Sequence, residues 1–206
     1  MFFLISGSAA SGKTTVARQI AALLDMTICH DADERPATTG EQRWNNLEIW
    51  VQEALGLQQD GYDFLLTAHS PLGELLACPS APQLNGIAAC VLDCDDVARI
   101  ERMWARGVDL RWPPSQGLLN WASWHRMHAH DPQWEPLAFT AHCPYPQHLE
   151  RWNTWERGDT RWQVERVDTT ALSVEETVEW LRAWIEARRS APQALTPATR
   201  WWEAEN

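Results

Sequence analysis

Phe2-Phe3-Leu4-Ile5-Ser6-Gly7-Ser8-Ala9-Ala10-Ser11-Gly12-Lys13-Thr14-Thr15 is the stretch of sequence that decides the fold of this chain. It opens with an apolar run typical of a buried strand, and residues Gly7 to Thr14 then follow the pattern G-x-x-x-x-G-K-[ST]. Beyond this loop, Val16 and Ile20 recur at helical spacing. Strand, glycine-rich loop and helix come in the order in which backbone N–H groups and a helix N-terminus bind phosphate. The stretch therefore predicts a nucleotide-phosphate site.

The choice of Lys13 supports the same prediction. It is the only lysine, because the other sixteen of the 17 basic residues are arginine. A compact ammonium suits the space between the β- and γ-phosphates, and a planar guanidinium fork differs from it in shape and reach. We expect Lys13 to be catalytic and the Thr14 hydroxyl to ligate Mg²⁺. The residues of this P-loop expected to bind the nucleotide are Gly7, Ser8, Ala9, Ala10, Ser11, Gly12, Lys13, Thr14 and Thr15.

Composition restricts the partners and the compartment. A formal net charge of −11 with no basic stretch argues against nucleic acid as a partner. No apolar run approaches the ~18 residues that a membrane helix requires, and the first strand begins at the amino terminus, so we expect no membrane contact and no targeting segment. The 5 cysteines form no C-x-x-C pair and are expected to be reduced. These features predict a cytoplasmic protein, either a monomer or a homodimer.

Four further strands are expected along the chain, at Thr27–His30, Asp63–Ala68, Ile87–Leu92 and Trp162–Val167. Helices are expected at residues 41–58, 97–106 and 117–129, with a last one that a capping box at Ser173 and Glu176 begins. Strands that alternate with helices predict a parallel α/β sheet with its ligands at the carboxyl ends of the strands. We expect a single domain over residues 1–189, with an insert at about 107–160 and a tail at 190–206.

In three places the chain resembles the P-loop small-molecule kinases, which include nucleotide, nucleoside, gluconate and shikimate kinases. These places are the P-loop, the acidic pair Asp31 and Asp33 after the second strand, and the segment Val167-Asp168-Thr169-Thr170 after the fifth. The resemblance implies a three-layer fold, a five-stranded parallel sheet of order 2-3-1-4-5 and a helical lid. It also implies ATP and Mg²⁺ as cofactors, with Asp168 and Thr169 binding the nucleotide beside the adenine.

The acidic pair is the candidate for proton transfer. Asp31 and Asp33 flank one small residue, so in extended geometry both carboxylates point to the same side. We assign Asp33 as the base that accepts the proton of the acceptor hydroxyl, and Asp31 as a Mg²⁺ partner through water. The reverse assignment stays open. A different role for the pair is a solvated loop that caps the next helix.

Arginines from the lid are the second implication of the resemblance, because they stabilise charge on a transferring phosphoryl group. Arg106 and Arg111 are expected to be catalytic in this way. Arg99 and Arg102 either join them or solvate a helix face. The residues expected to bind the acceptor are Arg35, Arg43, Trp44 and His69, and for the first three a surface or core role is an equal alternative.

The segment between Trp104 and Trp162 is rich in tryptophan and histidine. Its tryptophans either cover a helical surface or line an aromatic pocket. The group His125, His128, His130, His142 and Cys143 lacks the close Cys/His pairing of zinc sites, so we expect lid or surface residues rather than metal ligands.

These expectations favour an ATP-dependent phosphotransferase that moves the γ-phosphate to a hydroxyl of a small metabolite, such as a nucleoside or a sugar acid. The alternative is a nucleotide-binding regulatory protein or slow NTPase without a small-molecule acceptor. The third strand ends in Thr67-Ala68-His69-Ser70, with no acidic residue for Mg²⁺. Shikimate and gluconate kinase-like enzymes resemble the chain in this respect too.

Overall fold

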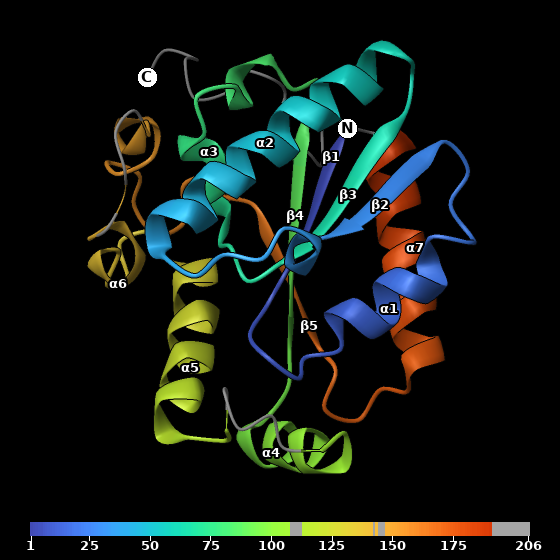
Figure 1. Cartoon of the computed structure of the whole chain (residues 1–206), viewed down its shortest axis with the longest axis vertical. Helices are drawn as coiled ribbons and strands as arrows, with labels where there is room; N and C mark the ends of the chain where they lie inside the picture. Colours follow the sequence, from blue (N-terminus) through green and yellow to red (C-terminus); the bar gives the residue numbers. More distant parts are fainter. Residues whose placement is uncertain (108–112, 142, 144–146, 191–206) are drawn as a thin grey trace.

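A five-stranded parallel sheet forms the centre of the molecule (Figure 1). The computed structural model describes residues 1–107, 113–141, 143 and 147–190. The strands are β1 (Phe2–Ser6), β2 (Thr27–Asp31), β3 (Asp63–Ala68), β4 (Ile87–Asp93) and β5 (Val164–Asp168). They follow the order β2-β3-β1-β4-β5, and all neighbouring pairs are parallel. The predicted sheet and its strand order are confirmed.

Helices cover both faces of the sheet and make three layers. The α-helices are α1 (Lys13–Ile20), α2 (Gly40–Gln59), α3 (Leu72–Ala77), α4 (Asp96–Ala105), α5 (Gln116–His130), α6 (Leu137–Thr140) and α7 (Val174–Ser190). Three short 3-10 helices are η1 (Ala32–Glu34), η2 (Ala81–Gln83) and η3 (Leu149–Arg151). Helices α1 and α7 pack on one face, while α2, α3 and α5 pack on the other (Figure 1).

The central strands are buried on both faces, which explains their unbroken apolar sequences. Leu4 points into the cluster under α2 and α3, and its neighbour Ile5 points into the cluster under α1 and α7. The last helix begins as predicted, because Ser173 N–H donates to Glu176 at 2.8 Å and Glu176 N–H donates to the Ser173 hydroxyl at 3.1 Å. This reciprocal pair satisfies two N–H groups that the first turn leaves without helical partners.

The tryptophan-rich segment builds part of the body of the fold. Trp124, Phe139, Trp152 and Trp162 are buried in the same cluster as α2 and α3. The packing is close, because a Cβ added at Gly73 in α3 would lie 2.8 Å from the Trp152 ring. These rings therefore pack mainly against neighbouring rings, and Trp162 also borders a cavity. Within the predicted lid insert at about 107–160, residues 108–112, 142 and 144–146 lie outside the described residues.

All five strands end at one edge of the sheet. The register pairs Asp31 with Thr67 and Asp93 with Asp168, so the polar residues that end the strands lie level with one another. The loop after β1 lies at this edge, and α4 lies just beyond it (Figure 1). The fold thus brings the P-loop and the acidic residues of the sequence analysis to one end of the molecule.

Candidate active site at the carboxyl edge of the sheet

The P-loop lies tightly against β4. Gly7 has a φ of 146°, and a Cβ added there would lie 2.3 Å from the carbonyl oxygen of Leu92, so only glycine fits. Gly12 has a φ of 97° and caps the start of α1. The hydroxyls of Ser8 and Ser11 are buried and find no hydrogen-bond partner among the described residues. Buried hydroxyls of this kind need a partner, and phosphate oxygens at this loop would satisfy them.

Lys13 lies folded into the loop. Its ammonium donates to the Ser8 carbonyl at 2.9 Å, and the residue is only 8% exposed. Burial lowers the pKa of Lys13 to about 8, while the nearby charges of Asp31 and Asp33 raise it again. The lysine therefore faces both carboxylates, as the sequence analysis placed it.

The two aspartates differ in what they contact. Asp31 Oδ1 accepts the backbone N–H of Asp33 at 3.0 Å and caps η1, whereas its Oδ2 is buried and has no partner among the described residues. Burial, followed by the charge of Asp31, raises the pKa of the Asp33 carboxyl against the opposing charge of Lys13. Both aspartates line a cavity of about 500 Å³ together with Thr14. The capping role considered for this loop is therefore real for Asp31, and it leaves Oδ2 free.

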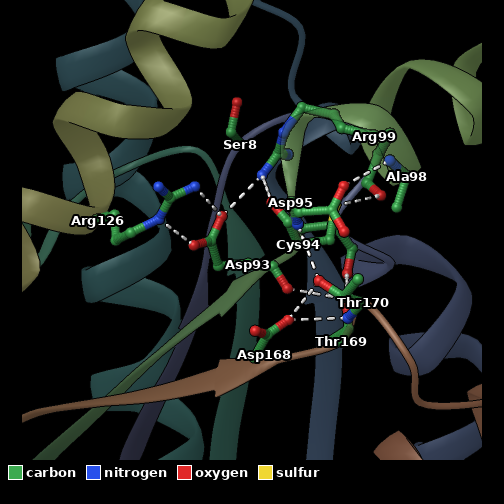
Figure 2. Close-up of polar contacts among 12 residues, drawn as sticks. Ser8, Asp93, Cys94, Asp95, Ala98, Arg99, Arg126, Asp168, Thr169 and Thr170 are labelled. Atoms are coloured by element: carbon green, nitrogen blue, oxygen red, sulfur yellow. Dashed lines mark hydrogen bonds and ion pairs between the residues drawn. The ribbon is translucent and has the colours of Figure 1, made fainter.

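Arg99 and Arg102 both reach backbone carbonyls of the P-loop, and Figure 2 shows Arg99 beside Asp93. Arg99 is fully buried and donates to Asp93 at 2.7 Å and to the Ala9 carbonyl at 2.5 Å. Arg102 donates to the Thr169 hydroxyl oxygen at 3.0 Å and reaches the Ala10 carbonyl at 3.5 Å. Arg99 and Arg102 therefore fit neither of the two roles expected from the sequence, a catalytic lid arginine or a solvated helix face. In the structure both bind backbone carbonyls of the loop.

Arg106 follows the last residue of α4 and is exposed. Burial is the main cause of the low pKa of Lys13, and Lys13 is the main cause of the low pKa of His69. The positive charge of Arg106 lowers the pKa of Lys13 and of His69 further, so Arg106 lies near both side chains. Its position suits the predicted catalytic role. Arg111, the second predicted lid arginine, lies outside the described residues.

Two of the residues expected to bind the acceptor, Trp44 and Arg35, contact other parts of the protein. Trp44 is 1% exposed and stacks on Phe139 in the core, so its ring is not available to a substrate and that expectation was wrong. Arg35 donates to Glu53 at 3.1 Å and lies over the Trp50 ring. Neither residue is among those near Lys13.

Arg43 remains beside the site because a buried carboxylate holds it. Its guanidinium forms an ion pair with Glu74, which is completely buried in α3. Burial raises the pKa of Glu74, and the charge of Arg43 opposes this effect. The charge of Arg43 also contributes to the low pKa of His69, after the larger contributions of Lys13 and burial.

His125 is a site residue that the sequence analysis placed in the lid or on the surface. The Ser6 hydroxyl donates to the Ser70 carbonyl at 2.5 Å and lies 2.9 Å from His125 Nε2. Since the Ser6 proton is already used, Nε2 donates and Nδ1 is the unprotonated nitrogen. Nδ1 is buried without a partner among the described residues. The sequence carries no local signal for this contact, because Ser6 and His125 are 119 positions apart along the chain.

Asp168 is exposed, whereas its neighbour Thr169 is buried against the P-loop. Asp168 caps its own turn by accepting the Thr170 N–H at 2.9 Å. Thr169 is 3% exposed, and its hydroxyl lies 2.9 Å from the Asp93 carbonyl and 3.3 Å from the Ser11 carbonyl. Thr169 therefore positions the loop, and its predicted contact with a nucleotide stays a prediction.

His128 is enclosed by aromatic rings. It stacks on Trp124 with ring centroids 4.8 Å apart and meets Trp162 edge-on at 5.3 Å. Burial lowers the pKa of His128 to about 4, and burial, followed by the charge of Lys13, lowers that of His125 to about 3. Both rings are therefore neutral in the folded protein at neutral pH. The expectation of surface or lid histidines was wrong for these two, and His142 lies outside the described residues.

The low pKa of His128 predicts a loss of stability in acid. The unfolded chain binds a proton at about pH 6.5 and the folded chain only near pH 4, so stability falls as the pH falls through this window. Between pH 7 and pH 5 we expect the free energy of unfolding of His128→Leu to fall by about 2 kcal/mol less than that of the parent protein. Urea unfolding at the two pH values measures this. His148→Leu, at a partly exposed histidine, is the control, and equal pH slopes for His128→Leu and the parent would contradict the prediction.

The described ranges contain neither a candidate metal-binding group nor a membrane-spanning helix. Within them, no group of three or more histidine, cysteine or acidic side chains is placed to hold a metal ion. None of the helices in the same ranges has the length and apolar character needed to cross a bilayer.

Solved structures share this arrangement. A thymidylate kinase from Candida albicans has a TM-score of 0.58 at 13% identity, over 91% of this chain and 92% of that chain. A sugar kinase from Janibacter sp. HTCC2649 has a TM-score of 0.54 at 18% identity, over 90% and 94%. A gluconokinase from Sinorhizobium meliloti 1021 has a TM-score of 0.51 at 16% identity, over 91% and 95%. No family model and no curated protein sequence matches the chain. At these identities the likeness is one of fold.

Proposed function

We propose that this chain, which has the fold of the P-loop small-molecule kinases, is an ATP-dependent phosphotransferase that moves the γ-phosphate to a hydroxyl of a small metabolite. The observation that supports this most is the grouping of Lys13, Asp33 and Arg106. Asp33, whose carboxyl has a raised pKa, and the exposed Arg106 both lie close enough to the Lys13 ammonium to change its pKa. Phosphoryl transfer needs positioning and charge stabilisation more than covalent chemistry, and this grouping supplies both.

The donor end of the reaction falls to the P-loop. Backbone N–H groups and the hydroxyls of Ser8 and Ser11 bind the phosphates, and Lys13 leaves the Ser8 carbonyl to bridge the β- and γ-phosphates. Thr14 and the free Oδ2 of Asp31 suit Mg²⁺, which prefers oxygen ligands and neutralises phosphate charge when bound. Arg106 then stabilises charge that develops on the transferring group.

The acceptor end falls to Asp33. Its carboxylate accepts the hydroxyl proton as the oxygen attacks the γ-phosphorus, while the bond from that phosphorus to the oxygen bridging to the β-phosphate breaks and ADP leaves. The raised pKa of Asp33 brings it closer to the working pH of a general base. Arg43, held by Glu74, and the neutral His69 lie close enough to influence one another electrostatically, beside Lys13. A hydroxylated metabolite with polar or anionic groups would find partners in both.

Replacing Asp33 by asparagine is the test of this function. We expect turnover to fall by about 10²–10³-fold while ATP affinity changes little, because the amide keeps the shape and loses the base. Acceptor-dependent ADP release from a panel of hydroxylated metabolites measures turnover. Glu41→Gln, at an exposed carboxylate in the first turn of α2, is the matched control.

Two results would contradict the proposal. Unchanged turnover in Asp33→Asn would remove Asp33 as the base. Slow ADP release that no acceptor accelerates would favour the regulatory protein or slow NTPase instead.

A further inference from the structure

A second cavity lies at the free edge of the sheet, away from the P-loop. It has a volume of about 760 Å³ and is bordered by the end of α5, residues 157–162 and strand β5. Strand β5 pairs only with β4 among the described strands, so its other side is open. Neither Lys13 nor Asp33 lines this cavity. It is therefore separate from the proposed phosphoryl-transfer site.

Three arginines from three segments line the cavity: Arg126 from α5, Arg157 from the connecting loop and Arg166 from β5. Arg157 is exposed and has no ion pair or hydrogen bond with any residue that the structure describes. Arg166 is half-exposed, and the carboxylate it approaches, Asp93, is 3.8 Å away. Two of the three guanidinium groups thus have little or no contact with acidic side chains.

The nearby carboxylates are already engaged. Asp93 accepts from Arg126 Nε at 2.5 Å on one side and from Arg99 at 2.7 Å on the other, as Figure 2 shows. Asp159 accepts two bonds from Arg161, at 2.9 and 2.6 Å. Asp168 caps its own turn, although its charge also reaches Arg166 and Arg126. Positive charge therefore exceeds negative charge around the cavity, in a chain whose net charge is −11.

The apolar part of the cavity gives it a fixed wall. Trp162 is held by a hydrogen bond from its Nε1 to the Ala129 carbonyl at 3.1 Å, and Val164 lies beside it at the start of β5. Guanidinium forks bind carboxylate and phosphate groups in a paired geometry and keep their charge at all physiological pH values. Guanidinium groups with few acidic partners, around a cavity that has an apolar wall, have the chemistry of an anion site.

We propose that this cavity, defined by Arg126, Arg157 and Arg166, binds a small anion that carries carboxylate or phosphate groups. Arg157 supplies a fork without a partner among the described residues, and Arg166 supplies a half-exposed fork with only a long ion pair to Asp93. Arg126 is fixed by Asp93 and positions the positive end of the cavity next to the residues that hold the P-loop. The site does not depend on the phosphotransferase activity, because none of its residues takes part in that chemistry.

Calorimetric titration of two probes tests the site. Inorganic phosphate and citrate are titrated at low ionic strength into Lys13→Met protein, in which phosphate binding at the P-loop is weakened. We expect saturable binding of one or both probes, and about tenfold or greater loss of affinity in Lys13→Met with Arg157→Gln and Arg166→Gln added. Binding of phosphate alone would identify a phosphoryl ligand, and binding of citrate alone would identify a carboxylate ligand.

The control adds Arg182→Gln to Lys13→Met, because Arg182 is an arginine of α7 that does not line the cavity. It should bind the probes like its parent. The proposal is overturned if neither probe binds saturably, or if the variant lacking both cavity arginines binds them as tightly as the control. Circular dichroism of each variant verifies that the fold is intact.

Discussion

Replacing Lys13 by methionine is expected to reduce phosphoryl transfer by about 10³-fold or more, because the one ammonium that can reach the transferring phosphate is lost. The side chain is 8% exposed and already enclosed by the loop, so methionine can occupy its space without exposing apolar surface. The unfolding free energy should therefore change much less than turnover. Single-turnover ADP formation at saturating ATP measures the loss of the chemical step.

The Lys13→Arg variant separates charge from shape. It keeps the positive charge and replaces a compact ammonium by a wider fork, in a space where Lys13 now lies 2.9 Å from the Ser8 carbonyl. We expect it to be nearly as inactive as Lys13→Met. Recovery of most of the activity would show that charge alone suffices. Arg182→Met on the exposed side of α7 serves as the control and should keep normal turnover.

Replacing Arg99 by methionine is expected to lower the unfolding free energy by about 3–5 kcal/mol, the usual cost of removing one partner from a buried ion pair. The guanidinium is completely buried between Asp93 and the Ala9 carbonyl. Without it, the only cationic partners of Asp93 among the described residues are the partly exposed Arg126 and the distant Arg166, and the P-loop loses a donor. Urea unfolding followed by far-ultraviolet circular dichroism measures the effect.

Arg182 on the surface of α7 provides the control for the Arg99 prediction. Removing Arg182, whose ion pair with Glu179 is on the surface, should leave the unfolding free energy nearly unchanged. ATP affinity should fall with stability in Arg99→Met, since the same residue holds the loop. A variant as stable as the parent protein would mean that Arg126 alone compensates the buried charge of Asp93.

The strands were predictable because each is an apolar run bounded by polar residues. The order 2-3-1-4-5 came from the family resemblance rather than from any periodicity, and the structure confirms it. The start of the fifth strand was the main error. It was expected at Trp162 and lies at Val164, because the Trp162 ring turns toward α5 and bonds to Ala129.

Side-chain roles were harder to predict wherever they depend on distant partners. Arg99 has the helical spacing of a solvated face, yet α4 begins so close to the P-loop that the guanidinium reaches its carbonyls. Trp44 occupies the expected helix, but its ring turns toward Phe139, which belongs to the tryptophan-rich segment. Lys13 lies near Asp31 and Asp33 because one short motif and one strand end determine their positions, and their roles stay predictions.

The single lysine has a consequence for protein chemistry. Across the 206 residues Lys13 carries the only side-chain amine, and burial lowers its pKa to about 8. An amine that loses its proton so near neutrality is a good nucleophile, so amine-directed acylating reagents and aldehydes have one lysine target, inside the P-loop, besides the α-amine of Met1. The modified fraction of the peptide that carries Lys13, measured by mass spectrometry, therefore reports the occupancy of that loop without a substituted residue or an attached label.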